Sequence, residues 1–153
     1  MLEKALILAA KAHTGQVDKG GAPYILHPIR VMLACEGEKE KIVALLHDTL
    51  EDTALTAADL RRAGFPEEIV QAVCCLTRGQ KEDYMEYIAR ICENALAAGV
   101  KYADLQDNLD IRRIPNPTER DFARIRKYEQ AMKRITRSVK GGREHGALDT
   151  GEL

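Results

Sequence analysis

The hydrophobic positions of the chain recur every three or four residues, which is the spacing of helices with one buried face. Residues 2–13 carry the first apolar stripe, and the polar segment 15–24, with three glycines and a proline, is typical of a loop. No segment alternates as a strand does, so the pattern predicts an all-α fold of about seven or eight helices. Further stripes predict helices that begin at or just after Pro28, Glu38, Thr56, Pro66, Tyr84, Val100 and Thr118.

Local signals set the expected helix boundaries. The helix in the middle of the chain is expected over residues 38–49. Gly99 is expected to separate a helix over 84–96 from another over 100–113, because glycine weakens a helix interior. Two capping boxes are expected, each a threonine followed three residues later by an aspartate, at Thr56–Asp59 and Thr118–Asp121.

Length and composition suit one domain. The chain has 153 residues, of which 45% are hydrophobic, enough for a single core. The last periodic stripe ends near Val139, so we expect a domain over residues 1–139 and a disordered tail over 140–153. The four cysteines form no CxxC pair, which predicts reduced thiols and a cytoplasmic location.

Charge argues against nucleic-acid and membrane partners. Charged residues make up 31% of the chain, but the net charge is −1, so no global basic field would attract such partners. No apolar run reaches the roughly 18 residues of a membrane span, and the N-terminus lacks the features of a signal peptide. A solvated helix face is the preferred interpretation of the basic residues near the C-terminus, Lys133, Arg134, Arg137, Lys140 and Arg143.

The helix expected over 38–49 ends in four titratable groups, His47, Asp48, Glu51 and Asp52. Unpaired charges beside a core are costly, so such groups are paired, solvated or bound to a metal ion. Glu51 lies at i+4 from His47, and Asp52 at i+4 from Asp48, so each pair shares a helix face. A solvated helix end is the simpler interpretation of this segment alone, and a metal site requires partners elsewhere in the chain.

Two other segments contain groups that suit the same ion. His27 stands at the start of a predicted helix, and Asp104 lies near an apolar stripe, with Asn108 one turn later on the same face. Together with His47 and Asp48 they form a set of two imidazoles and two carboxylates. Such mixed ligation suits Mn, Fe, Co or Zn rather than Ca. The spacing alone does not establish that the four side chains converge.

Four segments, in this order along the chain, resemble the hydrolase domain of the RelA/SpoT family, a branch of the HD-domain phosphohydrolases. The segments are residues 13–16, 21–28, 44–53 and 100–104. The resemblance extends over about residues 1–135 and implies the helical bundle of an HD domain. In size the chain resembles the stand-alone small alarmone hydrolases, the metazoan SpoT homologues among them.

The resemblance also implies roles for individual residues. The implied ligands of a Mn²⁺ ion, or of another divalent transition metal, are His27, His47, Asp48 and Asp104. The implied acid–base pair that handles the attacking water is Glu51 with Asp52, and the implied nucleotide contacts are Lys19 and Asn108. His13 is expected outside the ligand shell, as a packed or hydrogen-bonded histidine.

The implied activity is that of a metal-dependent hydrolase which removes the 3′-pyrophosphate of (p)ppGpp and releases GDP or GTP. The residue types suit this chemistry, because a metal ion supplies charge to a phosphoryl oxygen and a carboxylate takes the proton of the attacking water. The expected partner is a small nucleotide, with no nucleic acid and no membrane, and the oligomeric state is left open.

Several positions expected near the nucleotide depart from the family pattern. The family loop usually reads Arg-Lys-Ser-Gly, where this chain has Asp18, Lys19, Gly20 and Gly21. The family usually continues Arg-Leu-His-Asn-Met-Arg-Thr after the metal aspartate, where this chain has Leu105, Gln106, Asp107, Asn108, Leu109, Asp110 and Ile111. We therefore expect weaker or less base-selective hydrolysis of (p)ppGpp, improved by Asp18→Arg together with Ile111→Thr.

Three alternatives follow from the same residues. The chain could be an HD phosphohydrolase that acts on another nucleotide or on a phosphorylated cofactor such as NADPH. It could be a non-catalytic nucleotide-binding module, or a metal-stabilised interaction protein. Because all four implied ligands and both acids are present, we favour an enzyme.

Overall fold

The computed structural model describes residues 1–146. Its elements are α1 (Leu2–Ala12), α2 (Leu26–Ala34), α3 (Glu38–Leu46), α4 (Thr49–Asp52), α5 (Ala57–Arg62), α6 (Glu67–Cys75), α7 (Tyr84–Ile91), α8 (Ala95–Asn108), the 3₁₀ helix η1 (Ile111–Arg113) and α9 (Glu119–Gly146). Residues 1–146 contain no strand element, only an isolated bridge between Val17 and Pro23. The predicted all-α HD-type bundle is confirmed, and residues 1–146 contain more helices than expected.

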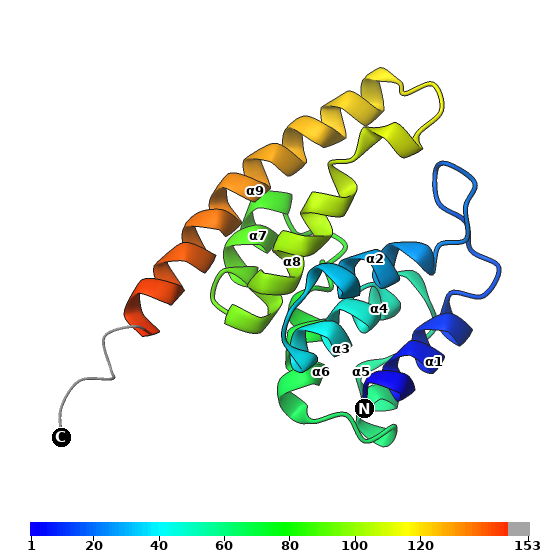
Figure 1. Ribbon diagram of the computed structural model, residues 1–153, viewed down its shortest axis with the longest axis vertical. Helices are drawn as coiled ribbons and strands as arrows, with labels where there is room; N and C mark the ends of the chain where they lie inside the picture. The colour runs from blue at the N-terminus through cyan, green and yellow to red at the C-terminus, as the bar shows by residue number, and fades with distance from the viewer. Residues whose placement is uncertain (147–153) are drawn as a thin grey trace.

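Helix α3 lies inside the bundle and packs against α1, α2, α6 and α8 (Figure 1). Residues 42–46 expose at most 4% of their surface, although they occupy every side of the helix. A helix that is apolar on all sides is one surrounded by other helices. Each large apolar side chain buried there contributes roughly 1.5–3 kcal/mol. This packing fixes the end of α3, where the titratable cluster begins.

The helix predicted over 38–49 is interrupted in the structure. Helix α3 ends at Leu46, His47 and Asp48 form a turn, and α4 begins at Thr49. The Thr49 hydroxyl donates a hydrogen bond to the Leu46 carbonyl at 2.7 Å and so satisfies one of the free carbonyls at the helix end. The turn brings His47 Nε2 within 3.0 Å of Asp48 Oδ2. Hydrophobic periodicity could not reveal this break, because the apolar stripe continues up to it.

Gly99 does not end a helix as predicted. The helix expected over 84–96 stops at residue 91, and Gly99 lies inside α8. The boundary is set instead by Asn94, whose side chain accepts a hydrogen bond from the backbone N–H of Ala97 at 2.9 Å and caps α8. Gly99 serves close packing, because a Cβ there would lie 3.1 Å from Oε1 of Glu40 on α3.

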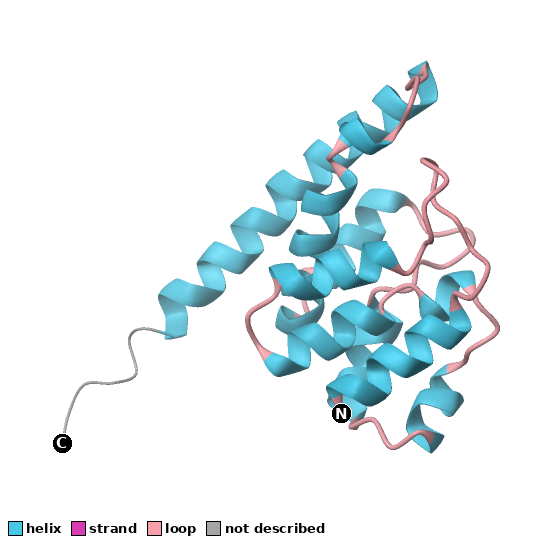
Figure 2. Ribbon diagram, turned by 45° about the vertical axis from the view of Figure 1, so that its right-hand side comes forward, coloured by secondary structure: helices cyan, strands magenta, loops and turns pink. Residues whose placement is uncertain are grey.

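The long helix α9 runs beside α7 and α8 (Figures 1 and 2). It continues beyond the predicted end near Val139 to Gly146, so residues 140–146 are helical; residues 147–153 lie outside the described residues. The division into a domain over 1–139 and a tail stays a prediction. The expected capping box is complete at Thr56–Asp59. At Thr118–Asp121 the aspartate accepts from the threonine backbone N–H at 2.8 Å and from its hydroxyl at 3.0 Å.

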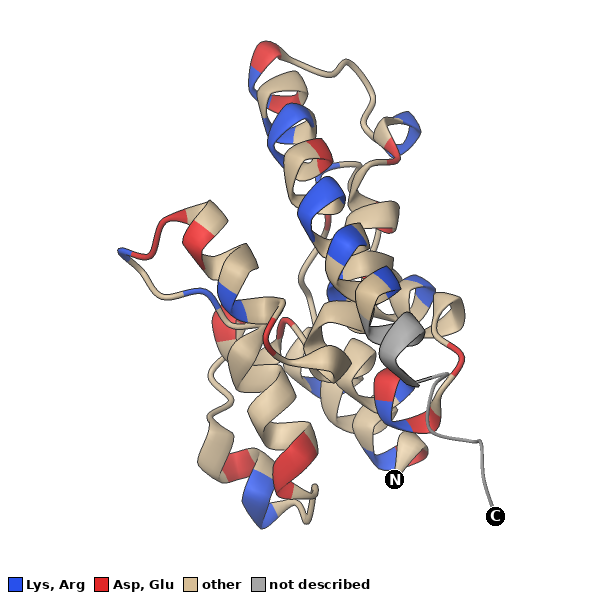
Figure 3. Ribbon diagram, turned by 90° about the vertical axis from the view of Figure 1, so that its left-hand side faces the viewer, with Lys and Arg blue, Asp and Glu red and all other residues tan. Residues whose placement is uncertain are grey.

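Basic residues are spaced along α9 (Figure 3). Four that were interpreted as a solvated face are exposed, Lys133, Arg134, Arg137 and Lys140, and the side chain of Arg143 lies outside the described residues. Within the described part of the chain, no helix combines the length and the apolar character that crossing a bilayer requires.

Candidate metal centre and substrate cavity

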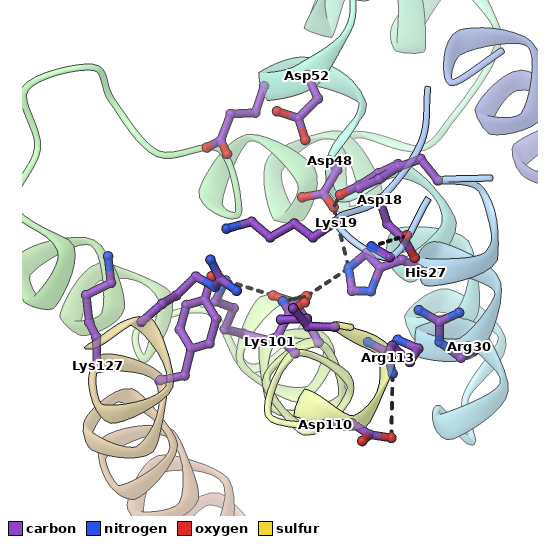
Figure 4. Close-up of a pocket in the computed structure, with 18 of the residues that line it drawn as sticks. Asp18, Lys19, His27, Arg30, Asp48, Asp52, Lys101, Asp110, Arg113 and Lys127 are labelled. Carbon is purple, nitrogen blue, oxygen red and sulfur yellow. Dashed lines mark hydrogen bonds and ion pairs between the residues drawn. The ribbon is translucent and has the colours of Figure 1, made fainter. Parts of the chain in front are cut away.

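The predicted ligands converge where α2, α3 and α8 meet. His27, His47 and Asp104 are buried, and each offers a ligand atom within 4.8 Å of the others. Asp104 Oδ1 lies 3.0 Å from His27 Nε2 and 3.5 Å from His47 Nε2. Asp48 Oδ2 lies 3.0 Å from His47 Nε2. The same oxygen lies 3.6 Å from His27 Nε2 (Figure 4). The structure thus brings together the four side chains predicted as ligands.

Ends of helices and a mid-helix position aim these side chains inward. His27 lies in the first turn of α2, His47 directly follows α3, and Asp104 is in the interior of α8. His47 Nδ1 lies 2.6 Å from the carbonyl oxygen of Ala44. This contact assigns the ring proton to Nδ1 and leaves the Nε2 lone pair directed at the carboxylates.

The donor set fits a divalent metal ion. His47 Nε2 is buried and has no hydrogen-bond partner among the described residues, although two carboxylates lie close to it. A buried polar atom without a partner is costly, and a metal ion held between the imidazole and the carboxylates would satisfy it. Burial lowers the pKa of His47, but the neighbouring Asp48 and Asp104 outweigh burial and raise it well above the ordinary value. In the absence of an ion, the same negative field attracts protons.

Asp104 is held on both sides by residues of its own helix. Lys101 Nζ donates to Oδ2 at 2.8 Å, and Asn108 Nδ2 donates to Oδ1 at 2.8 Å. Burial raises the pKa of the Asp104 carboxyl, but Lys101 and the two imidazoles outweigh burial and hold it well below its usual value. Burial likewise lowers the pKa of Lys101, and Asp104 raises it above the usual value. The two groups therefore stay charged, and the carboxylate is available to an ion.

Tyr24 is a site residue that sequence reasoning missed. Its hydroxyl donates to Asp48 Oδ2 at 2.5 Å. Burial and the Asp48 charge raise the pKa of Tyr24 well above its usual value, so the phenol keeps its proton and remains a donor. The Tyr24 ring also packs against His13, with ring centroids 4.9 Å apart, and His13 Nδ1 lies 2.8 Å from the side-chain oxygen of Gln16. The only sequence signal was an aromatic residue inside the motif 21–28.

The two predicted acid–base residues line the same cavity as Asp48. Glu51 Oε1 accepts a hydrogen bond from the backbone N–H of Arg78 at 2.7 Å, which fixes the carboxylate. Burial, together with the nearby charges of Asp48 and Glu51, raises the pKa of Asp52. A raised pKa makes this carboxylate a stronger base than an ordinary aspartate.

A cavity of about 430 Å³ opens beside these groups. One wall is basic and aromatic and carries Arg78, Lys101, Arg124, Lys127, Tyr84, Tyr87 and Tyr128. Lys127 Nζ lies 4.4 Å from the centroid of the Tyr84 ring. Burial, followed by the neighbouring cations Arg78, Arg124 and Lys101, lowers the pKa of Lys127. Such a wall favours an anionic ligand.

The two residues predicted to contact a nucleotide differ in their availability. Both line the cavity. The Lys19 side chain is 61% exposed, and its Nζ lies 3.7 Å from Asp121 Oδ1 at the start of α9. The Asn108 amide, in contrast, already donates to Asp104. Lys19 is mostly exposed and pairs only loosely with Asp121, so it can turn to an anion in the cavity, whereas Asn108 also supports a predicted metal ligand.

Relatives of known activity contain only a part that resembles this chain. No family model matches it. The guanosine-3′,5′-bis(diphosphate) 3′-pyrophosphohydrolase of Aquifex aeolicus is 32% identical over 120 residues, which cover 71% of this chain and 17% of that protein. The GTP pyrophosphokinase of Myxococcus xanthus is 30% identical over 144 residues, which cover 82% of this chain and 18% of that protein. The chain thus spans less than a fifth of the length of these two relatives.

A solved structure matches nearly the whole chain. The structure of a metazoan SpoT orthologue, described as hydrolysing ppGpp, superposes with a TM-score of 0.72 and 27% sequence identity. The match covers 92% of this chain and 85% of that one. This chain belongs to the RelA/SpoT family. The fold and membership expected from the four RelA/SpoT motifs are confirmed, and the roles of individual residues stay predictions.

The structure gives a reason for the departures from the RelA/SpoT loop pattern. Asp18 Oδ1 accepts hydrogen bonds from the backbone N–H groups of Gly20 and Ala22, both at 2.9 Å. A Cβ at residue 20 would lie 2.4 Å from the carbonyl oxygen of Arg113, so the serine usual in the family does not fit without a shift. Asp18 therefore shapes the loop. The expectation that Asp18→Arg improves hydrolysis stays a prediction, and on this geometry the change also removes two hydrogen bonds.

The departures that follow Asp104 also have structural roles. Leu105 is fully buried in the core, where an arginine would be costly. Asp107 Oδ2 lies 2.7 Å from His27 Nδ1, a contact that sequence reasoning missed. Ile111 opens η1 and is partly exposed. Both residues that differ from the RelA/SpoT pattern thus have structural contacts: Leu105 packs in the core, and Asp107 contacts His27.

Proposed function

We propose that this protein is a metal-dependent phosphohydrolase that removes the 3′-pyrophosphate of (p)ppGpp. The observation that carries the proposal is the position of the His27, His47, Asp48 and Asp104 cluster beside a cavity with a strongly basic wall. The cluster supplies the ligands of a metal centre, and the basic wall suits a substrate with several phosphates. The activities named for the bacterial and metazoan relatives agree with this substrate.

The metal would be held by the two imidazole Nε2 atoms and the carboxylates of Asp48 and Asp104. When bound, a divalent ion supplies positive charge to a phosphoryl oxygen. Mn²⁺ is the ion we propose, because mixed imidazole and carboxylate ligation suits it. Tyr24 and Lys101 hold the two carboxylates in place through hydrogen bonds of 2.5 and 2.8 Å.

Asp52 and Glu51 would move the proton of the attacking water. The oxygen of water attacks the phosphorus next to the 3′ oxygen, and the bond between that phosphorus and the 3′ oxygen breaks. The 3′ oxygen leaves and takes up a proton as the 3′-hydroxyl of GDP or GTP, and the water oxygen is retained in the released pyrophosphate. The raised pKa of Asp52 suits proton acceptance, and the Arg78 backbone N–H holds Glu51 beside it. Proton transfer by a positioned carboxylate contributes roughly 10²–10⁴-fold to a rate.

The remaining phosphates would contact the basic wall and the loop. Arg78, Arg124 and Lys127 line the cavity on one side, and Lys19 enters it from the loop. Guanidinium groups and ammonium groups bind phosphate oxygens through charge-assisted hydrogen bonds. Asn108 would support Asp104 and contact the sugar or a phosphate from the same wall.

A second candidate function deserves a test because the loop differs from the family pattern. Asp18 contributes a carboxylate where the family usually has an arginine, so guanine lacks one expected contact. An HD phosphohydrolase acting on another nucleotide or on NADPH would keep the same metal cluster and basic wall. A non-catalytic nucleotide-binding module is the third candidate.

All four cysteines are free thiols, in keeping with the proposed cytoplasmic location.

The test is a screen for phosphate and pyrophosphate release, with Mn²⁺, over ppGpp, its adenine counterpart, NADPH and simple phosphate esters. We expect pyrophosphate from ppGpp, no release in EDTA, and recovery when Mn²⁺ is added back. Release of orthophosphate from NADPH, with ppGpp untouched, would support the second candidate instead. Binding of ppGpp without turnover of any compound would favour the non-catalytic module.

A further inference from the structure

The two histidines of the metal centre are oriented by different partners. His47 Nδ1 faces a backbone carbonyl, that of Ala44, at 2.6 Å. His27 Nδ1 faces a side-chain carboxylate, Asp107 Oδ2, at 2.7 Å. The His27 ring therefore lies between two aspartates of α8, with Nδ1 on Asp107 and Nε2 3.0 Å from Asp104 Oδ1.

Asp107 is itself fixed by two arginines from other elements. Arg30 on α2 donates to both carboxylate oxygens, at 2.7 and 3.0 Å, and Arg113 in η1 donates to Oδ2 at 3.2 Å. Arg113 also donates to the Asp107 backbone carbonyl at 2.9 Å. The side chain is 11% exposed. A two-pronged arginine contact fixes the plane of a carboxylate, so the oxygen that faces His27 has little freedom to turn away.

We propose that Asp107 is a positioning residue for His27 as a metal ligand. Its carboxylate accepts the Nδ1 proton, which keeps the Nε2 lone pair and the ring plane directed at the metal position. A carboxylate in this place also makes the imidazole a stronger donor to a metal. The RelA/SpoT pattern usually has a histidine here, so this chain departs from the pattern at the residue that contacts His27.

The other interpretation is an ion pair that only joins α2 to α8. Under that interpretation the Arg30–Asp107 contact is what matters, and His27 is a bystander. Metal affinity distinguishes the two interpretations. Loss of an ion pair that only joins two helices lowers the stability of the fold, whereas loss of a positioning carboxylate weakens the binding of metal by His27 Nε2. Asp110 offers a matched control, because it lies 3.7 Å from Arg113 Nη1 and has no recorded contact with His27 among the described residues.

The experiment is a titration of the metal-free full chain with Mn²⁺, with free Mn²⁺ measured by electron paramagnetic resonance, for five proteins. They are the unmodified chain, Asp107→Ala, Asp107→Asn, Arg30→Gln and Asp110→Asn. We expect Asp107→Ala to bind Mn²⁺ about 10–100-fold more weakly. Asp107→Asn should lose less, because its amide oxygen can still accept the Nδ1 proton. Arg30→Gln should lose least of these three, and Asp110→Asn should match the unmodified chain.

An Asp107→Ala protein with the affinity of the unmodified chain overturns the proposal. Equal losses of Mn²⁺ affinity in Asp107→Ala, Asp107→Asn and Arg30→Gln also overturn it. The one change common to all three variants is the loss of the Arg30–Asp107 ion pair, so this ion pair alone would then explain the effect. If Asp107→Ala does not fold, Asp107→Asn against Arg30→Gln decides, with weaker binding in Asp107→Asn expected and equal binding contradicting the proposal. This inference rests on the metal site of the proposed function. An unmodified chain that binds no Mn²⁺ rejects that site, whereas unaffected Asp107 variants reject only the role of Asp107.

Discussion

The two ends of the cavity hold their charges in different ways. At the metal centre, buried imidazoles and carboxylates face one another, and His47 Nε2 lacks a hydrogen-bond partner among the described residues. At the loop end, the Asp18 carboxylate is already satisfied by the backbone N–H groups of Gly20 and Ala22. The metal centre therefore still has a nitrogen atom that can bind a ligand, whereas the loop-end carboxylate is already hydrogen-bonded within the loop.

This difference separates the chemistry of the site from its selectivity. A buried nitrogen without a partner is costly unless an ion completes it, so the metal centre tolerates little change. The loop end is stable without a ligand, so its residues can differ while the loop keeps its shape. Changes at the metal centre should therefore abolish metal binding or turnover, whereas changes at the loop end should only alter how well the substrate binds.

The largest expected effect comes from His47→Ala. The unmodified protein should retain about one transition-metal ion per chain after dialysis, and the variant almost none, because a ligand and the packing of the site are both lost. Metal content by mass spectrometry and helical content by circular dichroism are the measurements. His13→Ala is the control, since His13 is buried nearby but contacts Gln16, and it should keep its metal. Unchanged metal content in His47→Ala would show that the ligands are others.

The next largest effect tests whether Glu51 and Asp52 transfer the proton of the attacking water. Replacing Glu51 by Gln and Asp52 by Asn together should lower turnover by roughly 10²–10⁴, with metal content unchanged. Steady-state pyrophosphate release measures the turnover. Glu129→Gln, at an exposed acid of α9, should behave like the unmodified protein. Full activity in the double variant would mean that another group handles the proton.

A smaller effect is expected at the loop end. Asp18→Arg removes two loop hydrogen bonds, each worth about 0.5–1.5 kcal/mol, so KM for ppGpp should rise about tenfold with a smaller change in kcat. Asp18→Asn keeps the accepting oxygen and should stay close to the unmodified protein. Initial rates over a range of ppGpp concentrations decide. Faster hydrolysis in Asp18→Arg would restore the simple expectation from the family pattern and contradict the structural role of Asp18.

The smallest effect is expected at the cap of α9. Hydrogen bonds from the Thr118 backbone and hydroxyl, and from Arg124, lower the pKa of Asp121 from 3.8 to about 2. A carboxyl whose pKa is lower in the folded state adds stability above its unfolded pKa, and that stability is lost as the pH falls from about 4 towards 2. Urea unfolding across this range should show a shallower loss of stability for Asp121→Asn than for the unmodified chain. Identical dependence of stability on pH in the two proteins would contradict the lowered pKa of Asp121 in the folded state.

Much of the fold, and the side chains that converge in the candidate metal centre, could be predicted from the sequence because the signals are local. The stripes that form the helices repeat within a few residues, and His47, Asp48, Glu51 and Asp52 stand within one short segment. Their contiguity guarantees that they lie close together wherever the segment lies. His27 and Asp104 could be added because each stands in a recognisable motif of its own.

The remainder depended on contacts between distant segments. The His27–Asp107 contact joins residues 80 positions apart, and no periodicity predicts such a pairing. Gly99 was mistaken for a helix end because its packing against Glu40 of α3 is invisible in the local sequence. Asp18 was interpreted through the residue it replaces, whereas its hydrogen bonds to the loop backbone define its role.

If the cluster of His27, His47, Asp48 and Asp104 cleaves the bond between the 3′ oxygen and the pyrophosphate of (p)ppGpp, the reaction products will show it. Purified protein with Mn²⁺ would be mixed with ppGpp, and the products followed by ³¹P nuclear magnetic resonance. We predict pyrophosphate and GDP in equal amounts, with no reaction in His47→Ala. Orthophosphate as the product, or pyrophosphate release that His47→Ala leaves unchanged, would contradict the account.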